Sequence, residues 1–522
     1  MGEEVKEECG IAAVQLKKAV SEFPVGGAAE PLYRLLLQQQ NRGQLSAGIT
    51  TFNPQRPQLI NTYRDVGLVN EVFRSSNEPK FRAIMEKFSG TSGIGQTRYA
   101  TFGKDTKSYA QPFERKHGRK WKWFSFAFNG NIANYAELRR ELEEKSFHFQ
   151  LHSDTEVIMH HLAYGLRGEK KTELVDVFGQ LAESFDGAYN IVFVNADGDI
   201  AVARDAFGIR PLNIAQSDEM IAAASESSAL SNIHLENIQT VQPGEMIQIS
   251  PNGGMEKKRF AKRNGTAHCM FEWVYFANVA SEIDGKSVYE VRYRLGKELS
   301  KLEKEKITEE HIVVPVPDTA RAAADAFGYE LGIPVKEGLL RNRFVGRTFI
   351  ESNNRMEKAK AKYAINKSVL QGKKVFLVED SIVRGTTTKT IVDFIKKVGK
   401  AKEVHVRVSC PPIRFPCFYG IDMSTVSELI ISRHAKSFDR GILDVSEETE
   451  KSIAKEIGAD SVIYQKLDGL VKAIGFENGE RKLCLGCLTG KYPTPKGNEL
   501  VQIAVDNAKK GVTSRTYESV TC

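Results

Sequence analysis

A cysteine near the start of the chain is a candidate nucleophile. Cys9 follows the charged leader MGEEVKEE and precedes the apolar run 11–16. In one interpretation Cys9 is an ordinary buried residue of a first strand, since free cysteines are among the most buried residues. In the other the leader is removed, and the new α-amine, whose ordinary pKa is about 7.7–8.0, acts as the base that deprotonates the thiol.

A candidate phosphate site lies in residues 375–387, VFLVEDSIVRGTT. A strand-like run ends in the adjacent carboxylates Glu379 and Asp380, and a short loop containing Gly385 then opens a helix. Backbone N–H groups of such a loop bind phosphate, and the two acids suit ribose hydroxyls or Mg²⁺. The loop lacks the GxxxxGK[ST] pattern of a Walker A motif. The alternative is a capped helix with acids on the surface.

The cysteines are a third source of chemistry. They are Cys9, Cys269, Cys410, Cys417, Cys484, Cys487 and Cys522. An odd number in a long chain argues against a disulfide framework and leaves metal binding or nucleophilic catalysis. Cys484 and Cys487 have the spacing of half a metal site, which Cys269 and Cys417 could complete. By itself the spacing favours tetrahedral zinc over an iron–sulfur cluster.

The elements that must position these groups differ between the two halves of the chain. To about residue 240, strand-length apolar runs alternate with glycine-rich turns. We expect strands at 11–16, 189–205 (with a hairpin turn at 196–199) and 220–227, and helices at 133–145 and 154–166. The polar, turn-rich segment 251–267 is interpreted as a domain junction.

The second half reads as alternating strands and helices. We expect strands at 311–318, 373–380 and 403–409, and helices at 288–305 and 388–399. This alternation predicts a parallel sheet with right-handed crossovers. Ligands of such sheets bind at the carboxyl ends of the strands, where Glu379 and Asp380 would lie.

Bulk composition narrows the class of protein. A chain of 522 residues predicts two domains or more, and 41% hydrophobic with 27% charged residues is typical of a globular protein. No apolar run is long enough to span a membrane and no signal peptide is evident, so we expect a cytoplasmic protein. The net charge of +7 indicates mild attraction to anions, and without a basic stripe of interleaved aromatics we expect no nucleic-acid partner.

Taken together, these segments resemble the glutamine phosphoribosylpyrophosphate (PRPP) amidotransferases. Residues 375–387 resemble the PRPP loop of type I phosphoribosyltransferases, 343–350 (RFVGRTFI) that family's flexible lid, and 313–320 (VVPVPDTA) its pyrophosphate loop. The first half matches an N-terminal nucleophile (Ntn) glutaminase domain in the segments RGQLSAGI (42–49), GQTRYATFG (95–103), FNGNIANY (128–135) and SDTEV (153–157).

The resemblance implies a two-domain α/β fold, an αββα glutaminase sandwich followed by a type I phosphoribosyltransferase domain with a parallel sheet. The expected divisions are a propeptide at 1–8, an Ntn-type glutamine amidotransferase domain at 9–250, the phosphoribosyltransferase domain at 265–495 and a C-terminal tail at 496–522.

The resemblance also implies the roles of individual residues. Cys9 would be the nucleophile, the Asn129 side chain and the Gly130 N–H the oxyanion hole, Arg98 the ligand of the glutamine carboxylate and Asp154 that of its ammonium group. The residues implied for PRPP are Glu379, Asp380, Ser381, Arg384, Gly385, Thr386 and Thr387, with Mg²⁺ at Thr319, Glu379 and Asp380. In the cluster-bearing branch of the family, cysteines matching Cys269, Cys417, Cys484 and Cys487 hold a structural [4Fe–4S] cluster, which reverses the preference for zinc.

The activity implied is hydrolysis of glutamine through a thioester and use of the ammonia to displace pyrophosphate from PRPP. The product would be 5-phosphoribosylamine, the first committed intermediate of purine synthesis. An internal ammonia channel, feedback inhibition by purine nucleotides and a homotetramer are implied as well. The alternatives are a glutaminase with another acceptor, against which the PRPP loop argues, and a non-catalytic PRPP or nucleotide sensor, which would have lost the nucleophile or the loop.

Several positions depart from the family pattern. Asn41 and Phe128 stand where histidines are common, and neither is expected to carry chemistry. Glu379 replaces the first of two aspartates, and Ala320 stands where glycine is usual in the pyrophosphate loop. The segment ANVAS (277–281) replaces one that contains Arg-Pro-Asp-Ser. We expect these changes to affect PRPP use more than the fold.

Overall fold

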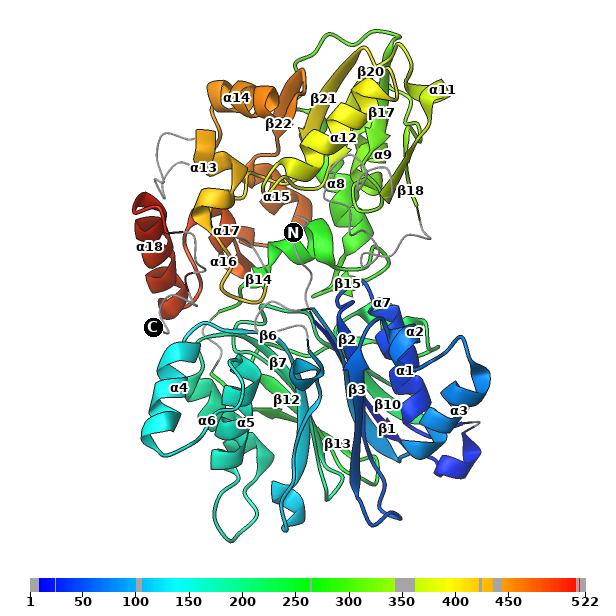
Figure 1. Ribbon diagram of the computed structural model, residues 1–522, viewed down its shortest axis with the longest axis vertical. Coiled ribbons are helices and arrows are strands. Elements are labelled where there is room, and N and C mark those ends of the chain that lie inside the picture. Colours follow the sequence, from blue (N-terminus) through cyan, green and yellow to red (C-terminus); the bar gives the residue numbers. More distant parts are fainter. Residues whose placement is uncertain are drawn as a thin grey trace.

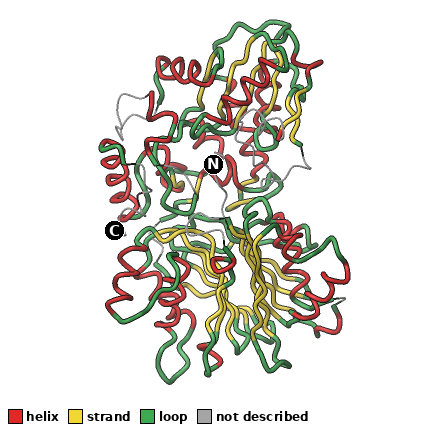
Figure 2. The backbone as a smooth tube through the Cα atoms, viewed as in Figure 1, coloured by secondary structure: helices red, strands yellow, loops and turns green. Residues whose placement is uncertain are grey.

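The computed structural model describes residues 9–23, 25–99, 106–262, 265–342, 362–421, 425–434, 444–512 and 516. Figure 1 shows two lobes, the first carrying the strands up to Arg259 and the second those from His268 onward. In Figure 2 the strands of the first lobe form two facing sheets between outer helices.

The first lobe contains a seven-stranded and a six-stranded antiparallel sheet. Their strand orders are β11-β9-β10-β1-β4-β2-β3 and β13-β12-β8-β7-β6-β5. The strands are β1 (Gly10–Leu16), β2 (Ser46–Phe52), β3 (Ile60–Val66), β4 (Ser92–Arg98), β5 (Phe113–Arg115), β6 (Phe124–Ile132), β7 (Gly187–Asn195), β8 (Ile200–Arg204), β9 (Asn213–Gln216), β10 (Met220–Ala224), β11 (Gln239–Thr240), β12 (Glu245–Ile249) and β13 (Met255–Arg259).

Alternating side chains of β1 show how the layers pack. Ile11 and Ala13 lie in the core between the two sheets, together with Val192 of β7. Ala12 and Val14 point to the opposite face and pack in the core beneath the outer helices. Because both faces of the strand are covered, the lobe is a four-layer αββα sandwich.

Helices cover the outer face of each sheet. Those packed in the outer core of the seven-stranded sheet are α1 (Ala29–Gln38), α2 (Val69–Val72), α3 (Glu78–Lys87) and α7 (Ser227–Ser231). Those of the six-stranded sheet are α4 (Tyr135–Glu144), α5 (Asp154–Gly165) and α6 (Leu174–Ser184).

The second lobe is built on a parallel sheet of order β17-β20-β21-β22. Its strands are β17 (His311–Pro315), β20 (Lys374–Glu379), β21 (Glu403–Val408) and β22 (Ser461–Tyr464). Its helices are α8 (Val288–Ser300), α9 (Arg321–Leu331), α11 (Lys367–Leu370), α12 (Thr386–Lys397), α13 (Ile430–His434), α14 (Glu447–Ile457), α15 (Leu467–Ile474), α16 (Gly479–Lys482), α17 (Gly486–Thr489) and α18 (Pro495–Lys509). Apolar cores lie on both faces of the sheet, as in other parallel α/β folds.

Short pairs of strands and helical turns complete the chain. The pairs are β14 (His268–Cys269) with β23 (Leu483–Cys484), β15 (Glu282–Ile283) with β16 (Lys286–Ser287), and β18 (Leu339–Arg341) with β19 (Tyr363–Ile365). The turns are η1 (Val20–Glu22), η2 (Lys107–Tyr109), η3 (Lys120–Lys122), the π-helical η4 (Glu272–Phe276) and η5 (Val426–Glu428). The predicted architecture, a glutaminase-like sandwich and a parallel-sheet domain, is confirmed.

Two segments have more structure than their composition predicts. Residues 255–259, within the expected junction, form β13, an edge strand paired with β12. Its charged side chains suit an edge, which explains why the segment reads as polar. Much of the segment expected as a C-terminal tail lies in α18, which buries Leu500, Val501, Ala504 and Val505. No helix in the described ranges is long and apolar enough to cross a membrane.

Candidate active sites

Cys9 lies next to Arg98 because of the pairing of β1 with β4. Gly10 is the partner of Thr97 in that pairing, so residues 9 and 98 stand at the same end of the sheet. The Cys9 Sγ lies 3.9 Å from the Tyr99 carbonyl oxygen. Burial raises the pKa of the Cys9 thiol, the Tyr99 backbone and the Arg98 charge oppose that rise, and the Asp154 charge adds to it. Cys9, Arg98 and Asp154 therefore share one site.

Asp154 is held at the start of α5. The Ser153 Oγ caps this helix by accepting from the Glu156 N–H at 3.3 Å, which orients the first turn. Burial raises the pKa of Asp154 to about 6, while the Ile132 and Thr155 backbones and the Arg98 charge oppose the rise. Since Ile132 ends β6, Asp154 lies beside the strand that carries Asn129.

Asn129 and Gly130 lie on β6, which faces β4 from the other sheet. Gln96 Nε2 on β4 donates to the Phe128 carbonyl at 2.7 Å and so ties the two sheets together beside Asn129. The Asn129 Nδ2 is buried without a hydrogen-bond partner among the described residues. An unpaired buried donor costs about 1–3 kcal/mol, so the Asn129 Nδ2 is a candidate to pair with a bound ligand.

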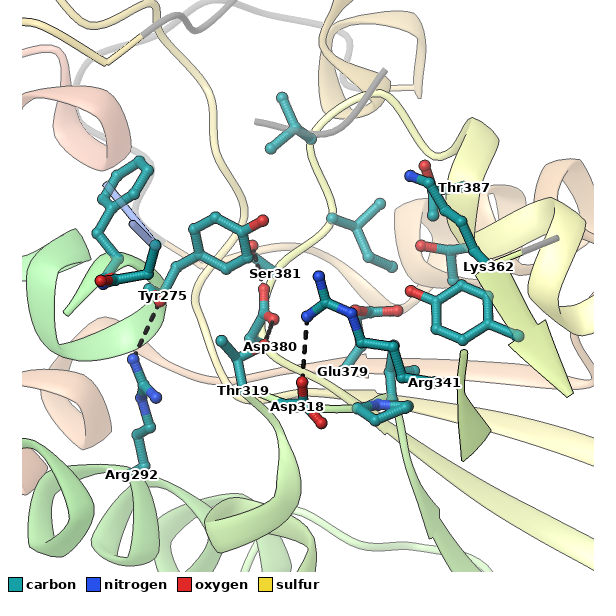
Figure 3. Close-up of a pocket in the computed structure, with 18 of the residues that line it drawn as sticks. Tyr275, Arg292, Asp318, Thr319, Arg341, Lys362, Glu379, Asp380, Ser381 and Thr387 are labelled. Atoms are coloured by element: carbon teal, nitrogen blue, oxygen red, sulfur yellow. Dashed lines mark hydrogen bonds and ion pairs between the residues drawn. The ribbon is translucent and has the colours of Figure 1, made fainter. Parts of the chain in front are cut away.

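The second site is a pocket of about 390 Å³ at the carboxyl edge of the parallel sheet (Figure 3). The lining includes all the residues predicted for PRPP and Mg²⁺ except Thr386: Thr319, Glu379, Asp380, Ser381, Arg384, Gly385 and Thr387. They meet because β17 and β20 are parallel neighbours, so the loops that follow both strands emerge at the same edge.

The Asp380 carboxylate is held in place by two hydroxyl groups. Ser381 Oγ donates to Asp380 Oδ1 at 2.6 Å, and Thr319 Oγ1 donates to Asp380 Oδ2. Hard cations such as Mg²⁺ bind carboxylate and hydroxyl oxygens, so the donor set of Thr319, Glu379 and Asp380 fits that ion.

The loop after β20 has the geometry of an anion site. Gly385 has φ +81° and immediately precedes α12, whose first N–H groups are available to a ligand. The positive φ would strain any side chain at Gly385, and an added Cβ would also lie 2.4 Å from the terminal Cδ1 of Ile430, so the position favours glycine. Thr386, although absent from the lining, has a buried Oγ1 without a partner among the described residues.

Sequence reasoning missed several residues of this pocket. Arg341 and Lys362 line it from either end of the segment 343–361, and Arg341 pairs with Asp318 at 3.1 Å. The sequence RNRFVGR (341–347) contains three arginines, but so short a basic run is also common on protein surfaces and was a weak signal for Arg341. The predicted lid, 343–350, lies outside the described residues, as do the leader, residues 100–103 of the predicted glutamine segment and Cys522.

The first lobe contributes to the same pocket. Asn41 and Gln44, which follow α1, are lining residues. Asn41 Nδ2 donates to the Phe276 carbonyl and to Glu226 Oε1, both at 3.1 Å. Asn41, which stands where the family commonly has a histidine, therefore bridges the two lobes.

Arg42 forms a buried ion network beside this bridge. Its guanidinium donates to Glu226 in the first lobe at 2.8 Å and to Glu272 in the second at 2.7 Å, and all three side chains are at most 1% exposed. Burial opposes the charge, but the two carboxylates raise the pKa of Arg42 above its ordinary value. The segment 277–281, whose sequence differs from the family pattern, joins this network. The Asn278 N–H and the Ser281 hydroxyl also donate to Glu226.

The four predicted cluster cysteines converge in the second lobe. Cys269 and Cys484 are direct partners in the β14–β23 pair. The Cys487 carbonyl accepts from the Arg414 and Phe415 N–H groups, which brings the segment of Cys417 alongside. Burial, followed by the charges of Cys417, Cys484 and Cys269, raises the pKa of the Cys487 thiol. Across the described ranges, however, no three His, Cys, Asp or Glu side chains are placed to hold a single metal ion.

Comparison with known proteins identifies the family. A model of the glutamine amidotransferase domain matches residues 96–232. The chain is 38% identical over 501 residues to the amidophosphoribosyltransferase of Methanothermobacter thermautotrophicus, covering 95% of this chain and 97% of that one. It is 34% identical over 494 residues to the Bacillus subtilis amidophosphoribosyltransferase, covering 94% and 95%. The chain belongs to the amidophosphoribosyltransferase family.

Solved structures agree with this assignment. The glutamine PRPP amidotransferase from B. subtilis, complexed with ADP and GMP, superposes with a TM-score of 0.79 at 33% identity, covering 94% of this chain and 98% of that one. A structure described as the allosteric regulatory enzyme of purine biosynthesis superposes with a TM-score of 0.79 at 34% identity, covering 93% and 96%.

The chain is therefore an enzyme of purine biosynthesis, both a glutamine amidotransferase and a pentosyltransferase. It hydrolyses glutamine and transfers the ammonia to PRPP, which yields glutamate, pyrophosphate and 5-phosphoribosylamine. This supports the predicted activity over a sensor or a glutaminase with another acceptor.

Proposed function

We propose that glutamine is hydrolysed in the first lobe by Cys9, with the residues predicted from sequence in their predicted roles. The observation that carries this proposal is that Cys9, Arg98 and Asp154 lie in one site. The charges of Arg98 and Asp154 both act on the Cys9 thiol. Arg98 binds the glutamine carboxylate and Asp154 its ammonium group, which directs the side-chain amide toward the thiol. Removal of residues 1–8 would convert the Cys9 backbone nitrogen into an amine that accepts the thiol proton.

The attacking thiolate forms a tetrahedral adduct whose oxygen carries the negative charge. The Asn129 Nδ2 and the Gly130 N–H donate to that oxygen. The α-ammonium group then returns the thiol proton to the leaving nitrogen, and ammonia departs as the thioester forms. Water then hydrolyses the thioester to glutamate. The Asn129 Nδ2 has no hydrogen-bond partner among the described residues, which supports this role. A donor that stabilises the charge of the adduct must be unoccupied before the adduct forms.

PRPP binds in the pocket of the second lobe. The 5-phosphate lies on the loop from Ser381 to Thr388, and Glu379 and Asp380 bind the ribose hydroxyls. Thr319, Glu379 and Asp380 would hold Mg²⁺, which neutralises charge on the departing pyrophosphate when it is bound. Arg341 and Lys362 add positive charge at the same pocket. Ammonia reaches this pocket through the interior, past the lining residues Asn41 and Gln44 of the first lobe.

The test is pyrophosphate release from PRPP and Mg²⁺, with glutamine or with ammonium as nitrogen donor. The wild-type enzyme should release pyrophosphate with both donors. Cys9→Ala should lose the glutamine reaction and keep the ammonium reaction, because the second site needs only ammonia. Glutamine hydrolysis without pyrophosphate release from either donor would contradict the PRPP site, and a glutamine reaction that survives Cys9→Ala would contradict the nucleophile.

A structural [4Fe–4S] cluster at Cys269, Cys417, Cys484 and Cys487 is part of the proposal. Four buried or half-buried thiols from three segments converge beside Arg210. Burial raises the pKa of the Cys269 thiol, and the positive charge of Arg210 opposes that rise. A single zinc with bonds of about 2.3 Å would need sulfurs about 3.8 Å apart, whereas an iron–sulfur cluster is larger and holds its ligands farther apart. Anaerobic Cys484→Ser should lose bound iron and sulfide. Stoichiometric zinc in the wild-type enzyme would contradict the cluster.

Further properties follow from the same family. Purine nucleotides are proposed as feedback inhibitors, supported by the B. subtilis structure complexed with ADP and GMP. A homotetramer and a cytoplasmic location remain proposals, which sedimentation and fractionation would test.

A further inference from the structure

A short segment of the second lobe lies directly on the strand that carries the oxyanion residues. Asn131 Nδ2 on β6 donates to the Phe418 carbonyl at 3.0 Å. Arg210, which is fully buried, donates from Nη2 to the Tyr419 carbonyl at 2.6 Å. Consecutive carbonyls of residues 418–419 are therefore bound by two side chains of the first lobe.

The next residue, Gly420, packs against Gly130 itself. Gly420 has φ +103°, and a Cβ at this position would lie 3.0 Å from both the carbonyl carbon and the carbonyl oxygen of Gly130. Gly130 has φ +144°, and a Cβ on it would lie 1.9 Å from the Ala188 oxygen of β7. The Gly130 residue is thus confined between β7 on one side and Gly420 on the other.

The segment is also held from behind. The Tyr419 hydroxyl lies 2.8 Å from Thr494 Oγ1, which caps the start of α18. The Lys496 N–H in the first turn of α18 donates to Asp186 Oδ2 in the first lobe at 2.9 Å. Residues 418–420 are consequently clamped between α18 and β6 and have little room to move relative to Gly130.

We propose that residues 418–420 are a positioning element for the oxyanion hole, with Gly420 the positioning residue for Gly130. This rests on the proposed role of Gly130. Oxyanion donors act only within a few tenths of an ångström of the correct place, so a neighbour that fixes the Gly130 backbone affects the rate of the glutamine reaction. The glutaminase centre is then complete only when the second lobe is docked.

The test is Gly420→Ala, with Gly265→Ala as the matched control. Gly265 has nearly the same φ, +106°, but a Cβ added there would meet none of the described residues within 4 Å, so this variant reproduces the backbone strain without the contact. We expect Gly420→Ala to lower kcat for glutamine hydrolysis about 10- to 100-fold, because loss of a whole oxyanion donor costs about 100- to 1,000-fold. KM for glutamine should stay within about twofold, since Arg98 and Asp154 are untouched.

Two readouts separate positioning from general damage. Ammonium-dependent pyrophosphate release and the rate at which iodoacetamide alkylates Cys9 should both stay near wild type, because neither uses an oxyanion donor. Because Cys417 is close in sequence to Gly420, iron content is measured as well. It should equal that of the wild-type enzyme if the cysteine site is undisturbed. Equal loss of the glutamine and ammonium reactions, or no loss relative to Gly265→Ala, would overturn the proposal.

Asn131→Ala provides a second route if Gly420→Ala does not fold. It removes one hydrogen bond to the segment and introduces no clash, so we expect a smaller fall in kcat, about 3- to 10-fold, consistent with a bond worth about 1 kcal/mol. Asn129→Ala distinguishes the oxyanion hole from the element proposed to position it. If Asn129→Ala abolishes glutamine hydrolysis while Gly420→Ala and Asn131→Ala do not reduce it, the oxyanion hole stands and the positioning element is wrong. If Asn129→Ala has no effect, the oxyanion hole itself is wrong.

Discussion

Among single residues, Asp154 shows how burial and function oppose each other. Its carboxylate must be ionised to bind the ammonium group of glutamine, yet burial raises its pKa to about 6. Helix N-terminal N–H groups and Arg98 compensate only in part. An acid with a raised pKa loses its charge on the acid side of that value, so the free enzyme binds glutamine poorly below it.

We therefore predict that kcat/KM for glutamine falls about tenfold per pH unit below the Asp154 pKa of about 6. Asp154→Asn should remove this acid limb and lower kcat/KM across the whole pH range, by about 10- to 100-fold, because it loses a charged hydrogen bond. A pH profile of glutamine hydrolysis measures both effects.

Asp205 offers a matched control in the same lobe. Burial raises its pKa to about 6 as well, and its carboxylate accepts the Phe207 and Ile209 N–H groups. Asp205→Asn should leave the acid limb in place. A limb that disappears in Asp205→Asn and persists in Asp154→Asn would reverse the assignment.

Among the elements, the junction of β20 with α12 shows why loop geometry matters for the PRPP site. β20 ends in Glu379, and α12 begins after Gly385 in the left-handed region. A non-glycine residue with positive φ costs about 1–2 kcal/mol, and at this position the side chain would also meet Ile430.

Gly385→Ala should raise KM for PRPP at least about tenfold with either nitrogen donor, because the phosphate loop is displaced for both reactions. Gly372→Ala is the control, since Gly372 has φ +73° and an added Cβ would meet nothing within 4 Å in the part of the chain that the structure describes. Steady-state kinetics with varied PRPP measure the difference. A selective effect on the glutamine reaction would contradict a phosphate-binding role.

At the scale of the whole molecule, the two active sites meet across a buried charge network. Arg42 belongs to the first lobe and neutralises Glu272 of the second, while Glu226 also binds Asn41 and the 277–281 segment. Removal of the Arg42 charge would leave two carboxylates short of a cation in a site that excludes water, which is far more costly than loss of a surface pair.

Arg42→Met should consequently lower the free energy of unfolding by about 3–5 kcal/mol. Arg34→Met, which breaks an exposed pair with Glu30 on α1, should cost less than about 1 kcal/mol. Denaturant unfolding followed by fluorescence compares the two variants. Equal midpoints would show that the network contributes no more than a surface ion pair.

Local patterns in the sequence were enough to predict the elements that carry the chemistry. The apolar periods at 311–318, 373–380 and 403–409 correspond to β17, β20 and β21, and the helical period at 154–166 corresponds to α5. Strand and helix periods, turns and caps depend on residues close in sequence, so they can be recognised without a structure. The polar edge strand β13 and the packed helix α18 were missed because their partners lie elsewhere in the chain.

By itself, the sequence determined the two-domain class, the order of the motifs and the residues that could react. Only the tertiary structure decided which of them meet: Asn41 and Gln44 in the PRPP pocket, four cysteines from three segments, and Gly420 against Gly130. The physical reason is the separation in sequence between the residues that interact. Periodicity reports which face of an element is buried, whereas a contact between residues hundreds of positions apart depends on how sheets and lobes pack, and no short window of sequence contains that information.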